Sequence, residues 1–289
     1  MEEKSFYATA GFVKDGIIEQ IQNEMAKRFP SEPKPVFDPR YTSIPNASAA
    51  YCFLSIGVEF PFPFYAHWGA FDFEASDGTR TDVTAFSSEP GEPDPNSRRV
   101  RKQVEILYYK YAEQGGADEF AVDVCKNAEP YQVVLACMDR REPLNAALKQ
   151  IEQDISQFRQ DPDYAELREL RPIDRLLVPD VLYKLTHHFK DLEGKFLNNP
   201  DWYRKEYFIF EARQMIHFAL SRTGVILKSE ALVGGGSAGI GPPRKELPRH
   251  FYFNRPFLIY VKKRGAEFSP FFVMWVDNAE LMSKFRLTD

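Results

Sequence analysis

Residues 253–278 read FNRPFLIYVKKRGAEFSPFFVMWVDN and contain two apolar runs, FLIYVKK and PFFVMWV, on either side of a turn at Gly265. Short runs that are rich in Phe, Val, Ile and Tyr and bounded by glycine or proline are typical of β-strands. We therefore predict that these two runs build a second sheet, separate from a central sheet formed by residues farther upstream.

Strand signals also dominate the first half of the chain. The run ASAAYCFLSIGVEFPFPF (residues 47–64) predicts a central strand, and FDFEASDGTRTDVTAF (residues 71–86) predicts a hairpin around its Asp-Gly turn. The acidic, Pro-rich residues 88–97 predict a surface loop, and the basic residues 98–102 that follow predict a solvated edge. Further strands are expected in residues 104–112, 119–125, 131–139 and 207–228.

Three segments carry apolar residues at helical spacing, and we predict a helix in each of them. Residues 11–29 run into a Pro-rich stretch that ends the first helix, residues 144–158 follow Pro143, and residues 181–197 form the third. The apolar positions of these helices are Ile17, Ile18, Ile21 and Met25, then Leu144, Leu148, Ile151, Ile155 and Phe158, then Leu182, Leu185, Phe189, Leu192 and Phe196.

The arrangement of these segments indicates the fold class. Strands that cluster apart from helices favour an α+β architecture, in which the two later helices cover sheets. No linker is long enough to separate two domains. We expect residues 1–34 to form an N-terminal helix and a Pro-rich lead-in to one domain of residues 35–289.

Composition limits the partners and the location. The formal net charge is -5 and no basic stripe stands out, so nucleic acid is not an expected partner. No apolar run reaches the ~20 residues that a membrane helix needs, and the acidic start MEEKSFYATAGF lacks the features of an export signal. We expect a soluble protein with no membrane partner, and the oligomeric state is left open.

Three cysteines, Cys52, Cys125 and Cys137, lie among apolar, strand-like neighbours and lack the short spacing of metal or redox motifs. This predicts reduced, buried thiols, which suit a reducing compartment, and hence a cytoplasmic location.

Motifs for catalysis or cofactor binding are missing from the sequence. GGGSAGIG (residues 234–241) lacks the Lys-Ser/Thr ending of a phosphate-binding loop and precedes Pro-Pro rather than a helix. No serine stands in a Gly-x-Ser-x-Gly motif, and the adjacent His187 and His188 would point apart on the expected helix. We expect no enzymatic activity, no cofactor and no metal.

The order of these segments resembles the C-terminal two-thirds of a serpin, over roughly residues 35–280. Residues 253–257 resemble the family's Phe-x-x-Pro-Phe entry to a strand pair, and Val276-Asp277-Asn278 resembles its closing Val-x-Asn-Pro. Met215-Ile216-His217 is similar to the Val-His of the strand that bears the reactive loop. Ser229-Glu230-Ala231 is similar to the Thr-Glu-Ala of the loop hinge.

The sequence also departs from the family pattern. Lys228 stands where the hinge glycine is expected, and Met274-Trp275 replace a Gly-basic pair. The N-terminal helices and strands that brace the central sheet in the family have no counterpart here.

The resemblance implies a serpin-like β core of several sheets with outer helices, lacking the N-terminal helical part. It also implies an inhibitor of serine-type proteases, whose exposed loop inserts into the central sheet after cleavage. His217 would then help to latch the sheet, although a hydrogen-bonded core histidine explains it equally well.

The loop itself allows two interpretations. The small residues of SEALVGGGSAG (residues 229–239) suit insertion into a crowded sheet. A plain flexible connector explains them too, and each glycine weakens a strand by ~0.5–1 kcal/mol relative to alanine. The alternative function is therefore a serpin-like binding or scaffold protein that does not inhibit.

The resemblance also predicts the bait. Counting forward from Lys228 leads to Pro242, and counting back from Pro256 leads to Lys245. Arg244 and Lys245 are the basic residues there, and they match the carboxylate in the specificity pocket of a trypsin-like serine protease, which is the expected partner. Pro243 favours an extended conformation before it, as protease substrates require.

Overall fold

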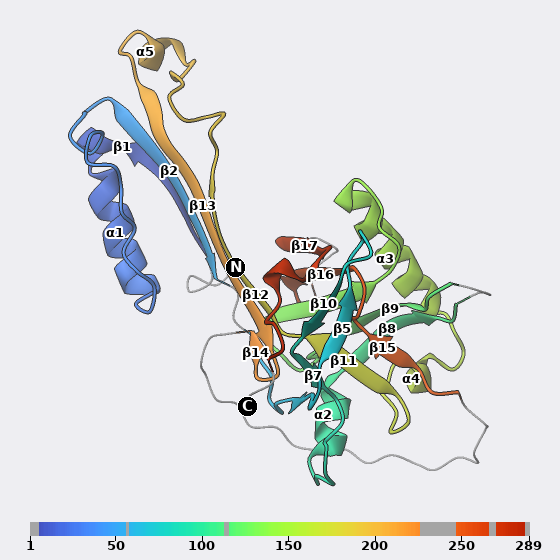
Figure 1. Ribbon diagram of the computed structural model, residues 1–289. Coiled ribbons are helices and arrows are strands. Elements are labelled where there is room, and N and C mark those ends of the chain that lie inside the picture. The colour runs from blue at the N-terminus through green and yellow to red at the C-terminus, as the bar shows by residue number, and fades with distance from the viewer. Residues whose placement is uncertain (1–5, 56–57, 113–115, 226–246, 266–269, 287–289) are drawn as a thin grey trace. The chain divides into compact units, whose positions relative to one another are not determined.

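The computed structural model describes residues 6–55, 58–112, 116–225, 247–265 and 270–286 (Figure 1). The chain divides into two compact units. The first comprises Met1–Ile56 and Tyr183–Phe218, and the second comprises Gly57–Leu182 and Ala219–Asp289.

The first unit contains a mixed sheet. Strand β1 (Phe6–Phe12) pairs antiparallel with β2 (Ala47–Ser55), and β2 pairs parallel with β13 (Phe208–Ser221). Strand β12 (Val181–His188) also pairs with β13. The short helix α5 (Pro200–Tyr203) lies between β12 and β13 in the sequence. The central position therefore belongs to the pair β2 and β13.

One helix covers a face of this sheet. Gly16 has a φ of 78°, which allows the chain to turn from the 3-10 helix η1 (Val13–Asp15) into α1 (Ile17–Arg28). In Figure 1, α1 lies along β1 and β2, and its apolar stripe packs on alternate residues of β2. The core formed in this way includes Ile17, Ile18, Ile21, Met25, Ala47, Ala49, Tyr51, Phe53 and Phe210.

The second unit contains further sheets. Strands β17, β16, β10, β9 and β8 pair in that order, all antiparallel, and β15, β11, β7 and β4 form another sheet. Strands β5 and β6 form a separate hairpin. The bounds are β3 (Val58–Glu59), β4 (Tyr65–Ala66), β5 (Phe71–Glu74), β6 (Arg80–Val83), β7 (Ala85–Ser87), β8 (Glu105–Lys110), β9 (Glu119–Asp123), β10 (Tyr131–Cys137), β11 (Arg175–Pro179), β14 (Gly224–Val225), β15 (His250–Tyr252), β16 (Phe257–Lys263) and β17 (Phe272–Val276).

Helix α3 (Leu144–Phe158) covers the sheet that contains β8 and β10 (Figure 1). Its residues Ala147, Leu148 and Ile151 pack against Tyr108 and Tyr260 of that sheet. Short helices lie elsewhere in the unit, at α2 (Ser97–Gln103), α4 (Tyr164–Leu167) and η2 (Ala279–Leu281).

Much of the predicted architecture is confirmed. The fold is α+β, the first two predicted helices form as α1 and α3, and the Asp-Gly hairpin forms as β5 and β6. The first helix is shorter than predicted, because residues 11–16 belong to the end of β1, to η1 and to the turn at Gly16. The runs FLIYVKK and PFFVMWV pair as β16 and β17 in a sheet distinct from that of β2.

The predicted helix of residues 181–197 is wrong, because residues 181–188 form strand β12 and the chain then turns. Tyr183 and Leu185 are half-buried and alternate with exposed Leu182 and Lys184. The sequence therefore also fits the two-residue period of a β-strand. Pairing with β13 provides the backbone partners, and Gly194 at a φ of 79° suits a turn.

The prediction for residues 98–102 needs a correction as well. They belong to helix α2 rather than to a solvated edge, and Val100 and Gln103 are its buried positions. Gln103 forms hydrogen bonds with the backbone of Phe62 through its carboxamide, which fixes the helix against that segment.

All three cysteines are free thiols. Cys125 and Cys137 are buried, and burial raises the pKa of each thiol to about 12. Cys52 is only half-buried, and burial raises its pKa as well. Across the described residues, no helix has the length and apolar character needed to cross a membrane.

The packing of α1 on the sheet predicts which substitutions lower the free energy of unfolding. Replacing Ile21, which is 0% exposed, with alanine should lower the free energy of unfolding by about 2–5 kcal/mol, because it leaves a cavity in the core. Replacing Leu182, which is 52% exposed, with alanine should cost less than about 1 kcal/mol. Urea denaturation of both variants checks this, and equal losses would contradict the packing described.

Candidate functional site

The candidate site is the parallel strand pair β2 and β13. Their register runs from Phe208 opposite Ala47 to His217 opposite Ser55, with a bulge between Ile209 and Glu211. The parallel ladder pairs the N–H and C=O groups that β2 and β13 direct toward each other, so any segment that entered between them would first have to replace these hydrogen bonds. The pair is closed in this structure.

Beyond this ladder the chain reverses and returns as β14. Val225 pairs antiparallel with Leu220 of β13, and Gly224 pairs with Ser221. On its other side β14 pairs antiparallel with β3, with Val225 opposite Val58. Strand β14 therefore lies between β13 and β3, and it runs antiparallel to both.

Backbone hydrogen bonds hold this reversal in place. The amide of Phe60 donates to the carbonyl oxygen of Thr223 over 3.3 Å, and the amide of Phe64 donates to that of Arg222 over 2.8 Å. Gly224 has a φ of 122°, which side-chain-bearing residues rarely adopt. The chain thus leaves β13 in a fixed direction up to Val225.

Side chains join β2 to β13 on the face covered by α1. The hydroxyl of Tyr51 lies 3.3 Å from the sulfur of Met215. The ring of Phe53 meets the imidazole of His217 edge-on, with centroids 5.4 Å apart. Separating the two strands would break both contacts.

A second set of contacts ties β13 to the segment that follows α1, and we call this set the latch. His217 Nδ1 lies 3.0 Å from Glu32 Oε2, with both side chains about one-fifth exposed. Arg213 Nη2 donates to the carbonyl oxygen of Val36 over 2.9 Å, and its guanidinium lies 5.0 Å from the ring centroid of Phe37. The latch fixes β13 to residues 29–44 from one side.

The latch also contains a buried carboxylate. Glu211 Oε1 lies 2.5 Å from Arg213 Nη2, and Glu211 is only 7% exposed. Burial raises the pKa of Glu211, although the charge of Arg213 acts in the opposite direction. The carboxylate therefore depends on Arg213 to stay charged beside the apolar core.

Of the site residues predicted from the sequence, His217 lies in the described part and occupies the latch. The other predicted residues, Ser229, Glu230, Ala231, Pro243, Arg244 and Lys245, lie outside the described residues. Glu32, Glu211 and Arg213 were not predicted from the sequence. The last two carried a signal, since charged residues within an apolar strand usually have a buried partner.

His187 and His188 do not lie on a helix, since both belong to β12. The ring of His187 packs edge-on against Phe189, and His188 Nδ1 lies 3.0 Å from Glu193 Oε1. Their different partners are consistent with the prediction that the two imidazoles do not converge.

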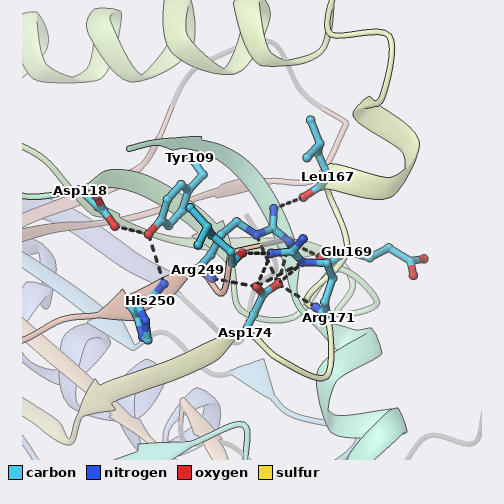
Figure 2. A network of polar contacts seen from close by, with 9 residues as sticks. Tyr109, Asp118, Leu167, Glu169, Arg171, Asp174, Arg249 and His250 are labelled. Carbon is cyan, nitrogen blue, oxygen red and sulfur yellow. Dashed lines mark hydrogen bonds and ion pairs between the residues drawn. The ribbon is translucent and has the colours of Figure 1, made fainter. Parts of the chain in front are cut away.

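A polar cluster in the second unit fixes the chain from Leu247 to the start of β15. Arg171 Nη2 donates to the carbonyl oxygen of Leu247 over 2.8 Å. Arg249 is 2% exposed and lies 2.7 Å from Asp174, and it donates to the carbonyl oxygens of Leu167 and Glu169 (Figure 2). We call these contacts the downstream anchor, because they fix the start of β15.

Asp174 is the centre of the anchor and is fully buried. Burial acts to raise its pKa, but the hydrogen bonds and charges of Arg171 and Arg249 outweigh burial and leave the pKa below the ordinary aspartate value. The contribution to stability is therefore complete above the unfolded-state pKa and is lost as the pH falls through the folded-state pKa.

We predict that Asp174→Asn lowers the free energy of unfolding at neutral pH by about 3–5 kcal/mol, because it leaves Arg249 buried without its charge partner. The matched control is Asp72→Asn, which breaks an exposed pair with Arg80 and should cost less than about 1 kcal/mol. Urea denaturation at neutral and acidic pH measures both. The Asp174 variant should lose less stability on acidification than the parent chain, and a parallel loss would contradict the assignment.

Comparisons with known proteins place the fold. No protein-family model matches the sequence, and no curated protein matches it. Native protease nexin-1 with heparin has 12% sequence identity and a TM-score of 0.51, with 92% of this chain and 66% of that chain covered. Thyroxine-binding globulin in complex with thyroxine has 9% identity and a TM-score of 0.50, with 91% and 65% covered.

Serpin48 of the insect Tenebrio molitor has 13% identity and a TM-score of 0.49, with 92% of this chain and 65% of that chain covered. The chain thus spans slightly less than two thirds of the length of these serpins. At such low identity the likeness shows a shared fold, which is the serpin fold.

Proposed function

We propose that this chain of serpin fold inhibits serine-type proteases, by presenting residues 226–246 as bait and inserting the cleaved loop into the sheet of β2 and β13. The observation that carries the proposal is the position of β14. It already runs antiparallel between β13 and β3, which is the direction that an inserting strand would need.

Insertion would exchange one ladder for two. A strand that continues the direction of β14 along β13 would replace the β2–β13 hydrogen bonds and add a second set of its own. The additional backbone hydrogen bonds and the buried side chains of the new strand would favour insertion. The cost is the separation of Tyr51 from Met215 and of Phe53 from His217.

The downstream anchor supports the same mechanism. Arg171 and Arg249 hold the chain at Leu247 and at the start of β15, whereas β14 holds it at Val225. A cut between these points would free the upstream part to move and leave the downstream part bound to its sheet. Ser229, Glu230 and Ala231 would act as the hinge in this movement.

The partner in this proposal is a trypsin-like serine protease, and the bait is Arg244 or Lys245 after Pro243. A basic side chain pairs with the carboxylate at the bottom of such a protease's specificity pocket. The chain itself supplies no catalytic group to this reaction. His217 takes part by holding the closed sheet through Glu32 until insertion begins.

The second candidate function is a binding or scaffold protein that does not inhibit. The latch favours it, because Arg213 and His217 both fasten β13 in the closed arrangement. The fold is compatible with either role, since thyroxine-binding globulin, solved in complex with thyroxine, matches about as well as protease nexin-1.

We predict that limited trypsin treatment cuts the chain once within residues 226–246, after Arg244 or Lys245. The nicked protein should then unfold at a temperature roughly 10 °C higher, as an additional ~3–5 kcal/mol would produce in a chain of this size. A fraction of the protease should also remain covalently attached after denaturation. Gel electrophoresis and thermal unfolding measure these outcomes.

The variant for this test is Arg244→Gln with Lys245→Gln, which should abolish both the cut and the complex. The control is Arg141→Gln with Lys149→Gln, two exposed basic residues outside the loop, which should change neither. Clean cleavage with no trapped protease and no gain in thermal stability would reject inhibition and leave the scaffold function.

A further inference from the structure

A cavity of about 380 Å³ lies within the second unit, apart from the strand pair and the latch. It is bordered by the end of β5, by the residues just before and within β9, and by β15 with the turn that follows it. The volume falls within the range of ~300–1,000 Å³ that is usual for small-molecule sites. The side chains around it decide which ligand would fit.

Two carboxylates border the cavity, and both are already engaged. Asp118 accepts hydrogen bonds from the Tyr109 hydroxyl and from the amide of Ala112, as Figure 2 shows for the first of these. Glu74 lies 2.6 Å from the guanidinium of Arg80. Glu74 therefore has a cationic partner, whereas both hydrogen-bond donors to the Asp118 carboxylate are neutral groups.

Three residues at the border of the cavity, His250, Asn254 and Arg255, have hydrogen-bond donors that remain available. Arg255 uses Nη2 to donate to the carbonyl oxygen of Asp118 over 2.9 Å, and Asp139 approaches its Nη1 only to 3.9 Å. A guanidinium has five N–H groups, so several can still bind a ligand. Within the described part of the chain, no hydrogen bond engages the Asn254 carboxamide or the His250 imidazole.

The backbone fixes His250 and Asn254 at the cavity. The amide of His250 donates to the Tyr109 hydroxyl over 3.1 Å, and in Figure 2 the imidazole extends away from that hydroxyl. The carbonyl oxygen of Asn254 accepts from the amide of Glu74 over 2.8 Å. Both residues are thus held by their main chains, and both side chains are exposed.

The remaining border is apolar. Phe120 is buried, and its ring packs edge-on against Phe251 and Phe253, so its position is fixed. Tyr252 and Pro256 are half-buried and add further apolar surface. A few convergent donors beside rigid aromatic groups are typical of sites for small organic molecules.

We propose that this cavity binds a small organic carboxylate with an apolar or aromatic body. The carboxylate would accept from Arg255, with Asn254 and His250 beside it, and the body would contact Phe120, Tyr252 and Pro256. Arg is the side chain best suited to a carboxylate, because its planar N–H groups can bind both oxygens. This site does not depend on loop insertion and does not rest on the proposed function.

The probe is 3-phenylpropionate, titrated into the full chain by isothermal titration calorimetry. The uncharged 3-phenylpropan-1-ol, of the same size and apolar body, serves as the matched ligand. The acid should bind at least about tenfold more tightly than the alcohol, since hydrogen bonds to charged groups are the stronger ones. Inorganic phosphate is a third titrant, and it should bind at least tenfold more weakly than the acid.

Variants locate the site. Arg255→Gln should weaken binding of 3-phenylpropionate about tenfold or more, and so should His250→Ala combined with Asn254→Ala. His187→Gln, an exposed histidine in β12, should leave the affinity unchanged. Because Arg255 also holds Asp118, the double variant decides the test if Arg255→Gln does not fold, as judged by thermal unfolding.

Three outcomes would overturn the proposal. These are no binding of 3-phenylpropionate at millimolar concentration, equal affinity for the acid and the alcohol, and unchanged affinity in the folded variants. Phosphate bound as tightly as the acid would show a bare anion site and would also reject the proposed ligand class.

Discussion

The parallel ladder between β2 and β13 is the constraint on which the candidate function depends. On one face it is tied by Tyr51 to Met215 and by Phe53 to His217, and the latch adds Glu32 as a partner of His217. The backbone of β13 then reverses into β14 without leaving its sheet. In the proposed function, insertion therefore depends on the free energy of opening this ladder relative to the gain from a new strand.

Buried charges determine where the chain can move. Asp174 with Arg249, and Asp123 with Arg264, are ion pairs in which the carboxylate is fully buried. A buried pair is weak evidence for net stability, but losing one partner is costly, so the pair fixes a unique arrangement of the segments it joins. The pair of Asp174 fixes the start of β15, and that of Asp123 fixes the end of β16 where Arg264 follows it. The anchor of Asp174 thereby restrains the segment that follows the proposed bait, and the contacts that join β2 to β13 belong to the first unit.

The sequence predicted the elements whose local pattern agrees with their final packing. Helices α1 and α3 have one unambiguous period and a clear beginning or end, such as Pro143 before α3. Residues 181–197 satisfy two periods, and pairing with β13 selects the strand, which no local pattern reveals.

Within the candidate site, His217 was found through the resemblance to a family. Glu32 could not be found, because it meets His217 only after α1 has packed and the chain has returned as β13. The hydrogen-bond donors at the cavity belong to His250, Asn254 and Arg255, and no sequence motif around these residues indicates a binding site.

A disulfide between β2 and β13 would prevent the two strands from separating. Gln214 lies directly opposite Cys52 in the parallel register, at a separation typical of neighbouring strands that is also compatible with a disulfide. The measurement is the thermal unfolding of the nicked Gln214→Cys chain, with its bond to Cys52 either oxidised or reduced. If the loop inserts between β2 and β13, nicking raises the unfolding temperature of the reduced chain and not that of the oxidised chain. An equal rise in both forms would contradict the claim that β2 and β13 must separate.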